Sequence, residues 1–256
     1  MADWTKRFSI AGRKAMVTGA SKGIGAEIAR VFADAGADVV AVARDADGLA
    51  ETAAAVRAKG VRCLTIVADL GDANAPGKAA TQALGEWGTI DILVNSAGIS
   101  RTGPATEFSL ADWDETMAVN LRAPFLLAQA LAPAMIAQRW GKIINISSQT
   151  GVIALDDHAA YASSKGGLNA LTKSLCAEWA RHNVQVNAIC PTVVLTPMGI
   201  KVWSPPEKSG PMLAATPLRR FGEAVEIADM ALYLASPAAE LVNGAILMIE
   251  GGYSSV

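Results

Sequence analysis

A glycine-rich segment near the N-terminus constrains the fold of this chain more than any other feature. Residues 18–25 read TGASKGIG, directly after the apolar residues 15–17 and before an alanine-rich helical pattern that Gly36 closes. Backbone without side chains can turn sharply and approach a pyrophosphate, whose charge the free amides of a helix N-terminus attract. The order of strand, turn and helix therefore predicts a dinucleotide site, although glycines also close turns for structural reasons. The turn residues that we expect to contact the cofactor are Gly19, Ser21, Lys22, Gly23, Ile24 and Gly25.

Short apolar runs alternate with helical patterns along the whole chain. Each run has the length of a buried strand, and they cover residues 15–18, 38–43, 62–67, 90–95, 142–147, 184–190 and 245–249. Continuous apolar strands are typical of a parallel sheet that helices cover on both faces, and 52% hydrophobic against 18% charged residues agrees with this. We predict an α/β fold, a Rossmann-like doubly wound parallel sheet in a single domain over residues 1–256, with ligands at the carboxyl ends of its strands.

Charge and composition argue against several classes of partner. The net charge is -2 and no block of basic residues occurs, so nucleic-acid binding is not expected. Residues 1–13 mix charged and apolar positions, unlike a secretory leader, and the uncharged segment 123–138 contains prolines and is too short for a bilayer span. The three cysteines are scattered, without metal-ligand spacing or a disulfide framework. We expect a cytoplasmic protein without a membrane segment or a bound metal.

The end of the second predicted strand indicates which dinucleotide is bound. An acidic side chain at this position would hold the ribose hydroxyls, whereas this chain has Ala43 followed by Arg44, and an arginine pairs with a 2′-phosphate. Lys22 in the glycine turn adds a second cation, so NADP(H) is favoured over NAD(H), unless both are ordinary solvated charges. After the third strand, Asp69 and Leu70 are expected at the adenine, although Asp69 could equally cap the next helix.

Tyr161 and Lys165 are the candidates for proton transfer. They stand four residues apart in YASSK and therefore share one face of a helix. A neighbouring ammonium favours the phenolate, so we expect Lys165 to bring the pKa of Tyr161 toward neutral pH. Ser148, at the end of a buried strand, would supply a second hydrogen bond to the same substrate oxygen. Each of these residues has a purely structural alternative, as a solvated helix face or a turn cap.

The stretch 191–221 has no clear periodicity and holds six prolines at positions 191, 197, 205, 206, 211 and 217. A long irregular segment inside a compact domain is more often functional than passive. We expect it to form a lid over the substrate, with a disordered linker as the alternative.

These motifs together resemble the short-chain dehydrogenase/reductase family over nearly the whole chain. The family's glycine turn matches Gly19, Gly23 and Gly25, and its fourth-strand motif matches residues 95–98, in which Asn95, Ala97 and Gly98 are implied cofactor contacts. Its catalytic residues match Asn120, Ser148, Tyr161 and Lys165, of which Tyr161 and Lys165 are also implied cofactor contacts. The resemblance implies that Asn120 holds a water linking Lys165 to solvent. It also implies nicotinamide contacts near Ile189, Val194 and Thr196. Two departures are Ser96 in place of asparagine and Thr192 in place of glycine.

The resemblance also bears on the substrate. Residues 191–199, Trp203 and His158 are similar to a group of carbonyl reductases in the family, in which positions matching Leu155, His158 and Trp203 line the substrate pocket beside Ser148 and Tyr161. This implies reduction of a small ketose or dicarbonyl to its alcohol. A polyol or sugar-acid dehydrogenase, possibly using NAD, is the alternative, and a nucleotide-sensing protein without turnover is a second one. The family usually forms tetramers through two long helices, here near 112–138 and 159–181.

Overall fold

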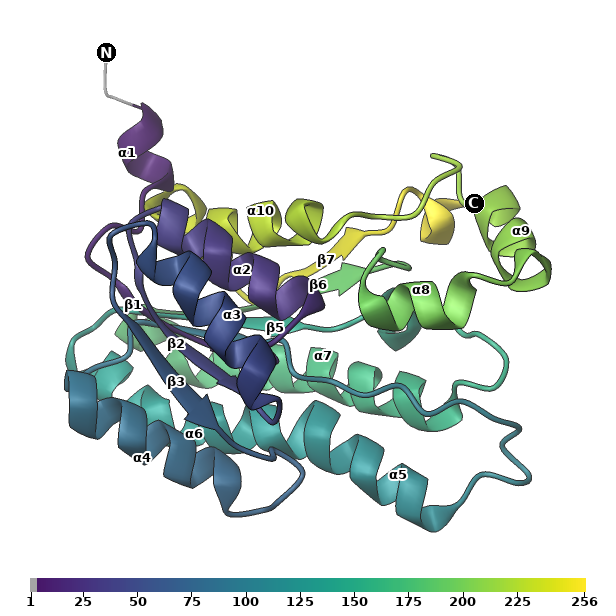
Figure 1. Cartoon of the computed structure of the whole chain (residues 1–256), viewed down its shortest axis with the longest axis horizontal. Helices are drawn as coiled ribbons and strands as arrows, with labels where there is room; N and C mark the ends of the chain where they lie inside the picture. The colour runs from purple at the N-terminus through teal and green to yellow at the C-terminus, as the bar shows by residue number, and fades with distance from the viewer. Residues whose placement is uncertain (1–3) are drawn as a thin grey trace.

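Seven parallel strands form one sheet in the computed structural model, which describes residues 4–256 (Figure 1). Their order is β3-β2-β1-β4-β5-β6-β7, so the winding direction reverses between β1 and β4. Every apolar run became a strand whose ends lie within two residues of the predicted ones, which confirms the doubly wound sheet. The strands are β1 (Lys14–Thr18), β2 (Asp38–Ala43), β3 (Cys63–Val67), β4 (Ile92–Asn95), β5 (Gly141–Ile146), β6 (Val184–Pro191) and β7 (Ile246–Ile249).

Helices cover both faces of the sheet (Figure 1). On one face lie α2 (Gly23–Asp34), α3 (Ala46–Arg57) and α10 (Ala224–Ala235), and on the other lie α4 (Ala75–Trp87), α5 (Leu110–Met117), α6 (Ala123–Ala137) and α7 (Ala159–Trp179). The first turns of the chain form the short helix α1 (Trp4–Phe8). Short 3-10 turns complete the chain at Gln149–Gly151, Ala180–His182, Pro237–Ala239 and Tyr253–Ser255.

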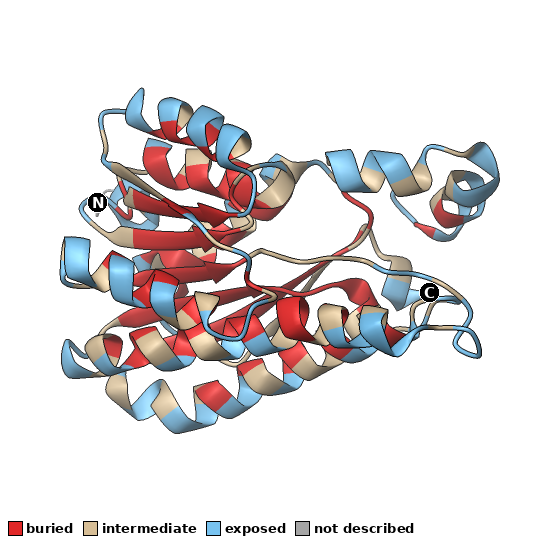
Figure 2. Cartoon of the chain, turned by 60° about the horizontal axis from the view of Figure 1, so that its bottom comes forward, coloured by how far each residue is buried: buried red, intermediate tan, exposed pale blue. Residues whose placement is uncertain are grey.

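The core consists of two apolar layers, one on each face of the sheet (Figure 2). In the α2 layer, Ile28 and Phe32 are fully buried at helical spacing, as the sequence pattern predicts. Gly36, with a φ of +87°, ends this helix in a conformation that glycine adopts without strain. In the opposite layer, Leu127 and Leu131 of α6 are fully buried against the sheet. Because both faces are covered, successive apolar residues of a strand face opposite layers, as Val39 and Val40 of β2 do.

Between α5 and α6 the helix widens into one π-helical stretch, Ala118–Arg122, which contains Asn120. The continuous helix Leu110–Ala137 is long and apolar enough to cross a membrane by composition, yet half of its apolar window is buried inside the domain. This burial is what a core helix of a globular domain shows. π-helical turns often occur at functional sites, because the wider turn disturbs the regular hydrogen bonding of the backbone.

The lid segment 191–221 is more ordered than its proline content indicates. It contains two helices, α8 (Pro197–Trp203) and α9 (Pro206–Ala215), so the prediction of an irregular stretch is wrong here. The reason is that Pro197 and Pro206 occupy the first position of each helix, where the amide needs no partner. Both helices stand out from the body of the domain and are mostly exposed (Figures 1 and 2).

The two ends of the lid are joined at its base. The amide of Leu195 donates to the Gly222 carbonyl at 2.8 Å, and the amide of Gly222 donates to the Val193 carbonyl at 2.9 Å. The Thr196 hydroxyl, at the start of α8, accepts a hydrogen bond from the Gly199 amide at 3.1 Å. A further hydrogen bond, from the Leu218 amide to the Gly251 carbonyl at 3.1 Å, attaches the end of the segment to the residues after β7.

Lys142 on β5 is an unfavourable group in this core. It is 2% exposed, and its Nζ has no hydrogen-bond partner among the described residues. Burial lowers its pKa from 10.5 to about 8, with the charge of Arg13 acting in the same direction and Glu240 opposing it. Since the folded pKa lies below the unfolded one, the protonated lysine destabilises the fold. The penalty is complete below pH 8 and disappears as the pH rises to 10.5.

We expect Lys142→Met to raise the free energy of unfolding by about 2 kcal/mol at pH 7, because the methionine keeps the volume and removes the buried charge. Urea unfolding at pH 7 and pH 10 measures this, and the gain should shrink at the higher pH. Lys78→Met, at an exposed site on α4, is the control and should leave stability nearly unchanged. An equal gain at both pH values would contradict the argument.

Candidate active site

A cleft of about 420 Å³ opens at the carboxyl ends of the strands, where the winding direction reverses. We call one end of the cleft the turn end; it is formed by the glycine turn, the end of β2 and residues 68–70. The other end, the lid end, is formed by residues after β5, by the start of α7 and by the lid. The predicted site residues that line it are Gly19, Ser21, Lys22, Gly23, Ile24, Gly25, Arg44, Asp69, Leu70, Ala97, Gly98, Ser148, Leu155, His158, Tyr161, Lys165, Val194, Thr196 and Trp203. Asn95 and Asn120 do not line it.

The glycine turn has no room for side chains. Gly19 has a φ of +67°, and a Cβ there would lie 2.9 Å from the Cα of Ala97. Gly23 also has a positive φ, and a Cβ on Gly25 would overlap the Gly19 carbonyl. The turn thus presents bare backbone to the cleft at the N-terminus of α2, as a pyrophosphate site requires.

Thr18, at the end of β1, is a residue that the sequence argument missed. Its hydroxyl accepts hydrogen bonds from the amides of Ser96 and Ala97, both at 3.0 Å, and donates to the Val94 carbonyl at 3.4 Å. One buried hydroxyl therefore fixes the glycine turn against the loop after β4. The sequence signal for this role was the position of Thr18 immediately before the glycine turn. Its hydrogen-bond partners could not be identified from the sequence, because they lie 76 to 79 positions away.

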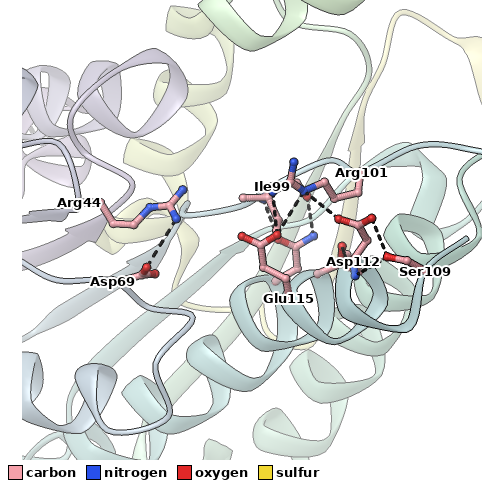
Figure 3. A network of polar contacts seen from close by, with 9 residues as sticks. Arg44, Asp69, Ile99, Arg101, Ser109, Asp112 and Glu115 are labelled. Carbon is pink, nitrogen blue, oxygen red and sulfur yellow. Dashed lines mark hydrogen bonds and ion pairs between the residues drawn. The ribbon is translucent and has the colours of Figure 1, made fainter.

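Arg44 and Asp69 form an ion pair at the turn end of the cleft, with 3.6 Å between Nη1 and Oδ2 (Figure 3). Both side chains are 57% exposed, so this pair contributes little to stability and the guanidinium remains accessible. The Asp69 carboxylate also accepts the Gly71 amide at 3.0 Å, which gives it a local structural role. Lys22 lines the same end, so two cationic side chains lie at the turn end of the cleft.

Ser148 is held so that its own proton remains available. Its Oγ accepts hydrogen bonds from the Thr150 amide at 3.2 Å and from the Thr150 hydroxyl at 3.0 Å. With its acceptor positions used, the Ser148 hydroxyl is left to donate toward Tyr161 and the cleft. Thr150 is therefore a second residue that the sequence argument missed, two positions after the serine that it orients.

Tyr161 and Lys165 lie together at the lid end of the cleft, one turn apart on α7. The Lys165 ammonium donates to the Ile146 carbonyl at 2.7 Å and lies 5.7 Å from the centre of the Tyr161 ring. Lys165 is 4% exposed, and its burial lowers its pKa to about 8. Both groups thus reach the carboxyl end of β5, where Ser148 also lies.

The expectation that Lys165 lowers the pKa of Tyr161 is wrong for this structure. Burial raises the pKa of the phenol, and the hydrogen bond with Ser148 opposes this only in part. The physical reason is that burial disfavours the charged phenolate more than the hydrogen bond from Ser148 favours it. Tyr161 is therefore protonated at neutral pH, which is the form of a proton donor.

Two asparagines act behind the cleft wall. The Asn120 side chain, from the π-helical stretch, accepts the Ile99 amide and donates to the Ile99 carbonyl, both at 2.9 Å, and also donates to the Ser164 hydroxyl at 3.1 Å. It thereby fixes the loop after β4 against α7. Asn95 donates to the Asn145 carboxamide on β5 at 2.8 Å and is 2% exposed, so its side chain serves the interior of the sheet and not the cleft.

An ion-pair network holds the same loop from outside (Figure 3). Arg101 binds Glu115 at 2.8 Å and Asp112 at 3.5 Å, and Asp112 belongs to the N-terminal cap of α5, where its amide donates to Ser109. The loop between β4 and α5 is therefore attached to α5 through Arg101 and to the π-helical stretch through Ile99.

Leu155, His158 and Trp203 meet at the lid end of the cleft, as expected. The Trp203 ring also packs on Phe221, with 6.3 Å between ring centres, so it both lines the cleft and joins α8 to the C-terminal end of the lid segment. His158 lies beside Tyr161, with 6.2 Å between ring centres. The sequence argument missed further lining residues here, which are Gln149, Thr150, Thr192, Met198, Val202 and Met212.

Comparison with known proteins gives matches along nearly the whole chain. The family model described as Enoyl-(Acyl carrier protein) reductase matches residues 19–254. D-threitol dehydrogenase of Mycolicibacterium smegmatis is 44% identical over 247 residues, which are 96% of this chain and 95% of that protein. L-xylulose reductase of Bos taurus is 40% identical over 248 residues, which are 95% of this chain and 97% of that protein.

A solved structure gives the same result. Gluconate 5-dehydrogenase of Burkholderia cenocepacia, in complex with NADP and tartrate, superposes with a TM-score of 0.94 at 37% identity, and the match covers 99% of this chain and 100% of that one. The structural match and the sequence matches therefore relate this chain to the same group of proteins.

Proposed function

This chain belongs to the short-chain dehydrogenase/reductase family, and from that premise we propose that it is an NADP(H)-dependent oxidoreductase that interconverts a small ketose or dicarbonyl with its alcohol, similar to L-xylulose reductase. The observation that carries the proposal is the meeting of Tyr161, Ser148 and Lys165 in one cleft with the bare glycine turn and Arg44. Relatives that are named for polyols and sugars support the substrate class.

In the proposed reaction the protein positions the carbonyl and supplies a proton. When bound, NADPH supplies the hydride that reduces the carbonyl carbon. Tyr161 gives its proton to the carbonyl oxygen, and Ser148 donates a hydrogen bond to the same oxygen. Lys165 returns a proton to Tyr161 and recovers its own from solvent, through a water that the family resemblance implies at Asn120. The lid excludes bulk water while this takes place.

The residues at the turn end would hold the cofactor. The amides of the glycine turn face the pyrophosphate, and Arg44 with Lys22 face the 2′-phosphate. Asp69, Leu70, Ala97 and Gly98 are proposed at the adenosine and ribose, and Val194 and Thr196 at the nicotinamide. Solved relatives with bound NADP support this assignment.

The raised pKa of Tyr161 bears on the direction of the reaction. Reduction requires the protonated phenol, which is present at neutral pH, whereas oxidation requires the phenolate. We therefore favour reduction near pH 7. Polyol or sugar-acid oxidation is the second candidate, because several relatives carry dehydrogenase names.

Initial rates with NADPH and NADH test the proposal on a panel of small ketoses, vicinal dicarbonyls and polyols. We expect NADPH-dependent ketone reduction near pH 7 and polyol oxidation that rises with pH, as the phenolate becomes populated. Binding of NADPH without turnover on any member of the panel would favour a nucleotide-sensing protein instead.

We also propose that the protein is cytoplasmic and forms a homotetramer. The helix Leu110–Ala137 exposes Leu110, Trp113 and Phe125 on the surface of the domain, at 74%, 36% and 39%. Exposed apolar side chains of this size on one helix support a subunit contact. Light scattering on a size-exclusion peak decides the number of subunits.

A further inference from the structure

A third asparagine, Asn169, lies behind the cleft wall and has no part in the reaction described above. It stands on α7 four residues after Lys165, so the two side chains lie on one face of the helix. The Asn169 side chain is 7% exposed and does not line the cleft. A buried carboxamide is unfavourable unless it is hydrogen-bonded, so its partners indicate what it serves.

The Asn169 carboxamide joins α7 to the 3-10 turn Gln149–Gly151 that follows β5. Its Nδ2 donates to the Gly151 carbonyl at 3.2 Å, and because a carbonyl can only accept, this contact fixes the orientation of the amide. Its Oδ1 then accepts a hydrogen bond from the Cys190 thiol on β6, with 3.8 Å between sulfur and oxygen. Burial raises the pKa of this thiol, so it keeps its proton at neutral pH. Asn169 is therefore held in one orientation between a strand and a turn.

Gly151 packs so closely on α7 that it has no room for a side chain. A Cβ at this position would lie 2.8 Å from Asn169 Nδ2 and 2.9 Å from the carbonyl carbon of Lys165. Gly151 does not have a positive φ, so the glycine permits a close approach and not an unusual backbone conformation. The turn and the helix therefore touch between Lys165 and Asn169.

Hydrogen bonds to α7 lie on both sides of Ser148 in the sequence. Before it, the Ser147 hydroxyl donates to the Lys165 carbonyl at 3.2 Å. After it, the Gly151 amide donates to the Ser148 carbonyl at 3.0 Å, and Asn169 binds the Gly151 carbonyl. Ser148 thus lies between two points at which its segment is bound to the helix that carries the other catalytic residues. Asn169 supplies the second of these points.

We propose that Asn169 is a positioning residue that sets the Ser148 hydroxyl relative to Tyr161. The inference rests on the proposed function and deepens it. Because Asn169 does not line the cleft, it acts through Ser148, which donates a hydrogen bond to the substrate oxygen. A displacement of about 1 Å in such a group can lower the rate about 100-fold. The loss caused by a change at Asn169 therefore has an upper limit, which is the loss caused by removing the Ser148 hydroxyl itself.

A double-mutant cycle on the purified full-length protein tests this inference. Asn169→Leu keeps the branched shape and removes both hydrogen bonds, and we expect kcat for NADPH-dependent reduction of the best ketone of the panel to fall at least about 10-fold. In the Ser148→Ala background the same substitution should lower kcat by less than about twofold, because the group that Asn169 positions is already absent. The affinity for NADPH, followed by fluorescence titration, should change little in all of these proteins, because the turn end is untouched.

Asn187→Leu is the matched control for the loss of a buried carboxamide. Asn187, on β6, is 2% exposed, and its side chain binds two backbone groups, the Val242 carbonyl at 2.9 Å and the Ala245 amide at 3.0 Å. It does not line the cleft. We expect Asn187→Leu to lower stability in urea unfolding, as Asn169→Leu does, and to change kcat by less than about threefold. An equal fall of kcat in Asn187→Leu would overturn the inference.

Gly151→Ala disturbs the same contact from the other side and serves if Asn169→Leu does not fold. The added methyl group must push the turn away from α7, so we expect a loss of kcat that again depends on the presence of the Ser148 hydroxyl. Equal fold losses with and without that hydroxyl, in either variant that folds, would overturn the inference and leave the proposed function intact. A wild-type protein that turns over no member of the panel would overturn the proposed function, and this inference with it.

Discussion

Replacing Tyr161 with phenylalanine is expected to lower kcat for ketone reduction about 1,000-fold, because general acid catalysis commonly contributes between about 100-fold and 10,000-fold. Phenylalanine keeps the ring that packs beside His158 and removes the hydroxyl on which Ser148 acts. Tyr161 is the one tyrosine among the described residues that line the cleft, and the Lys165 ammonium lies 5.7 Å from the centre of its ring. The substitution therefore removes the proton donor of the reaction and leaves the shape of the cleft unchanged.

Two measurements separate this loss from misfolding. The affinity for NADPH, followed by fluorescence titration, should change little in Tyr161→Phe, because the turn end is untouched. Tyr233→Phe, on α10 and away from the cleft, should keep full activity. A loss of less than about tenfold in Tyr161→Phe would show that another group supplies the proton.

Replacing Arg44 with serine is expected to reduce kcat/KM for NADPH about 100-fold and to leave kcat/KM for NADH nearly unchanged. Among the described residues, an exposed ion pair with Asp69 is the one contact of the guanidinium, so a phosphate can bind the guanidinium at little cost. A charge-assisted, bidentate contact with a phosphate is worth about 3 kcal/mol, which corresponds to this factor. NADH has no 2′-phosphate and cannot lose the contact.

Arg30→Ser is the matched control for charge. Arg30 lies on α2 in an exposed ion pair with Glu27 and does not line the cleft, so its loss should affect both cofactors little. Equal losses with NADPH and NADH in Arg44→Ser would mean that the arginine supports the fold of the turn end rather than reading the phosphate. A wild-type protein that prefers NADH would remove the basis of the argument.

The elements that depend on local pattern were predictable from the sequence. The strand ends and the buried face of α2, with Ile28 and Phe32, follow from hydrophobic periodicity, which a buried sheet and an amphipathic helix make visible. The lid helices were missed because their prolines were interpreted as breakers, although Pro197 and Pro206 stand at helix starts. The position of a proline within the helix, and not the proline content of the segment, decided whether a helix forms.

The parts of the candidate site that depend on tertiary contacts were not predictable in this way. Thr18 and Thr150 act through hydrogen bonds that form only when distant loops meet or a local turn closes. Asn95 was assigned to the cofactor by resemblance, yet its side chain points to Asn145 inside the sheet. The predicted direction of the Tyr161 pKa shift was wrong because burial outweighs the effect of the nearby charge. The burial of a side chain cannot be inferred from the spacing of residues in the sequence.

The hydrogen-bonded base of the lid, where residues 193–195 meet Gly222, holds both ends of the segment between them. A second attachment, from the Leu218 amide to the Gly251 carbonyl at 3.1 Å, holds the C-terminal part of this segment, so α8 and α9 project between two fixed points. Replacements within 197–215 can therefore alter the wall of the cleft that Met198, Val202 and Trp203 form without disturbing the strands. Loop exchange in this stretch is compatible with an unchanged nucleotide end.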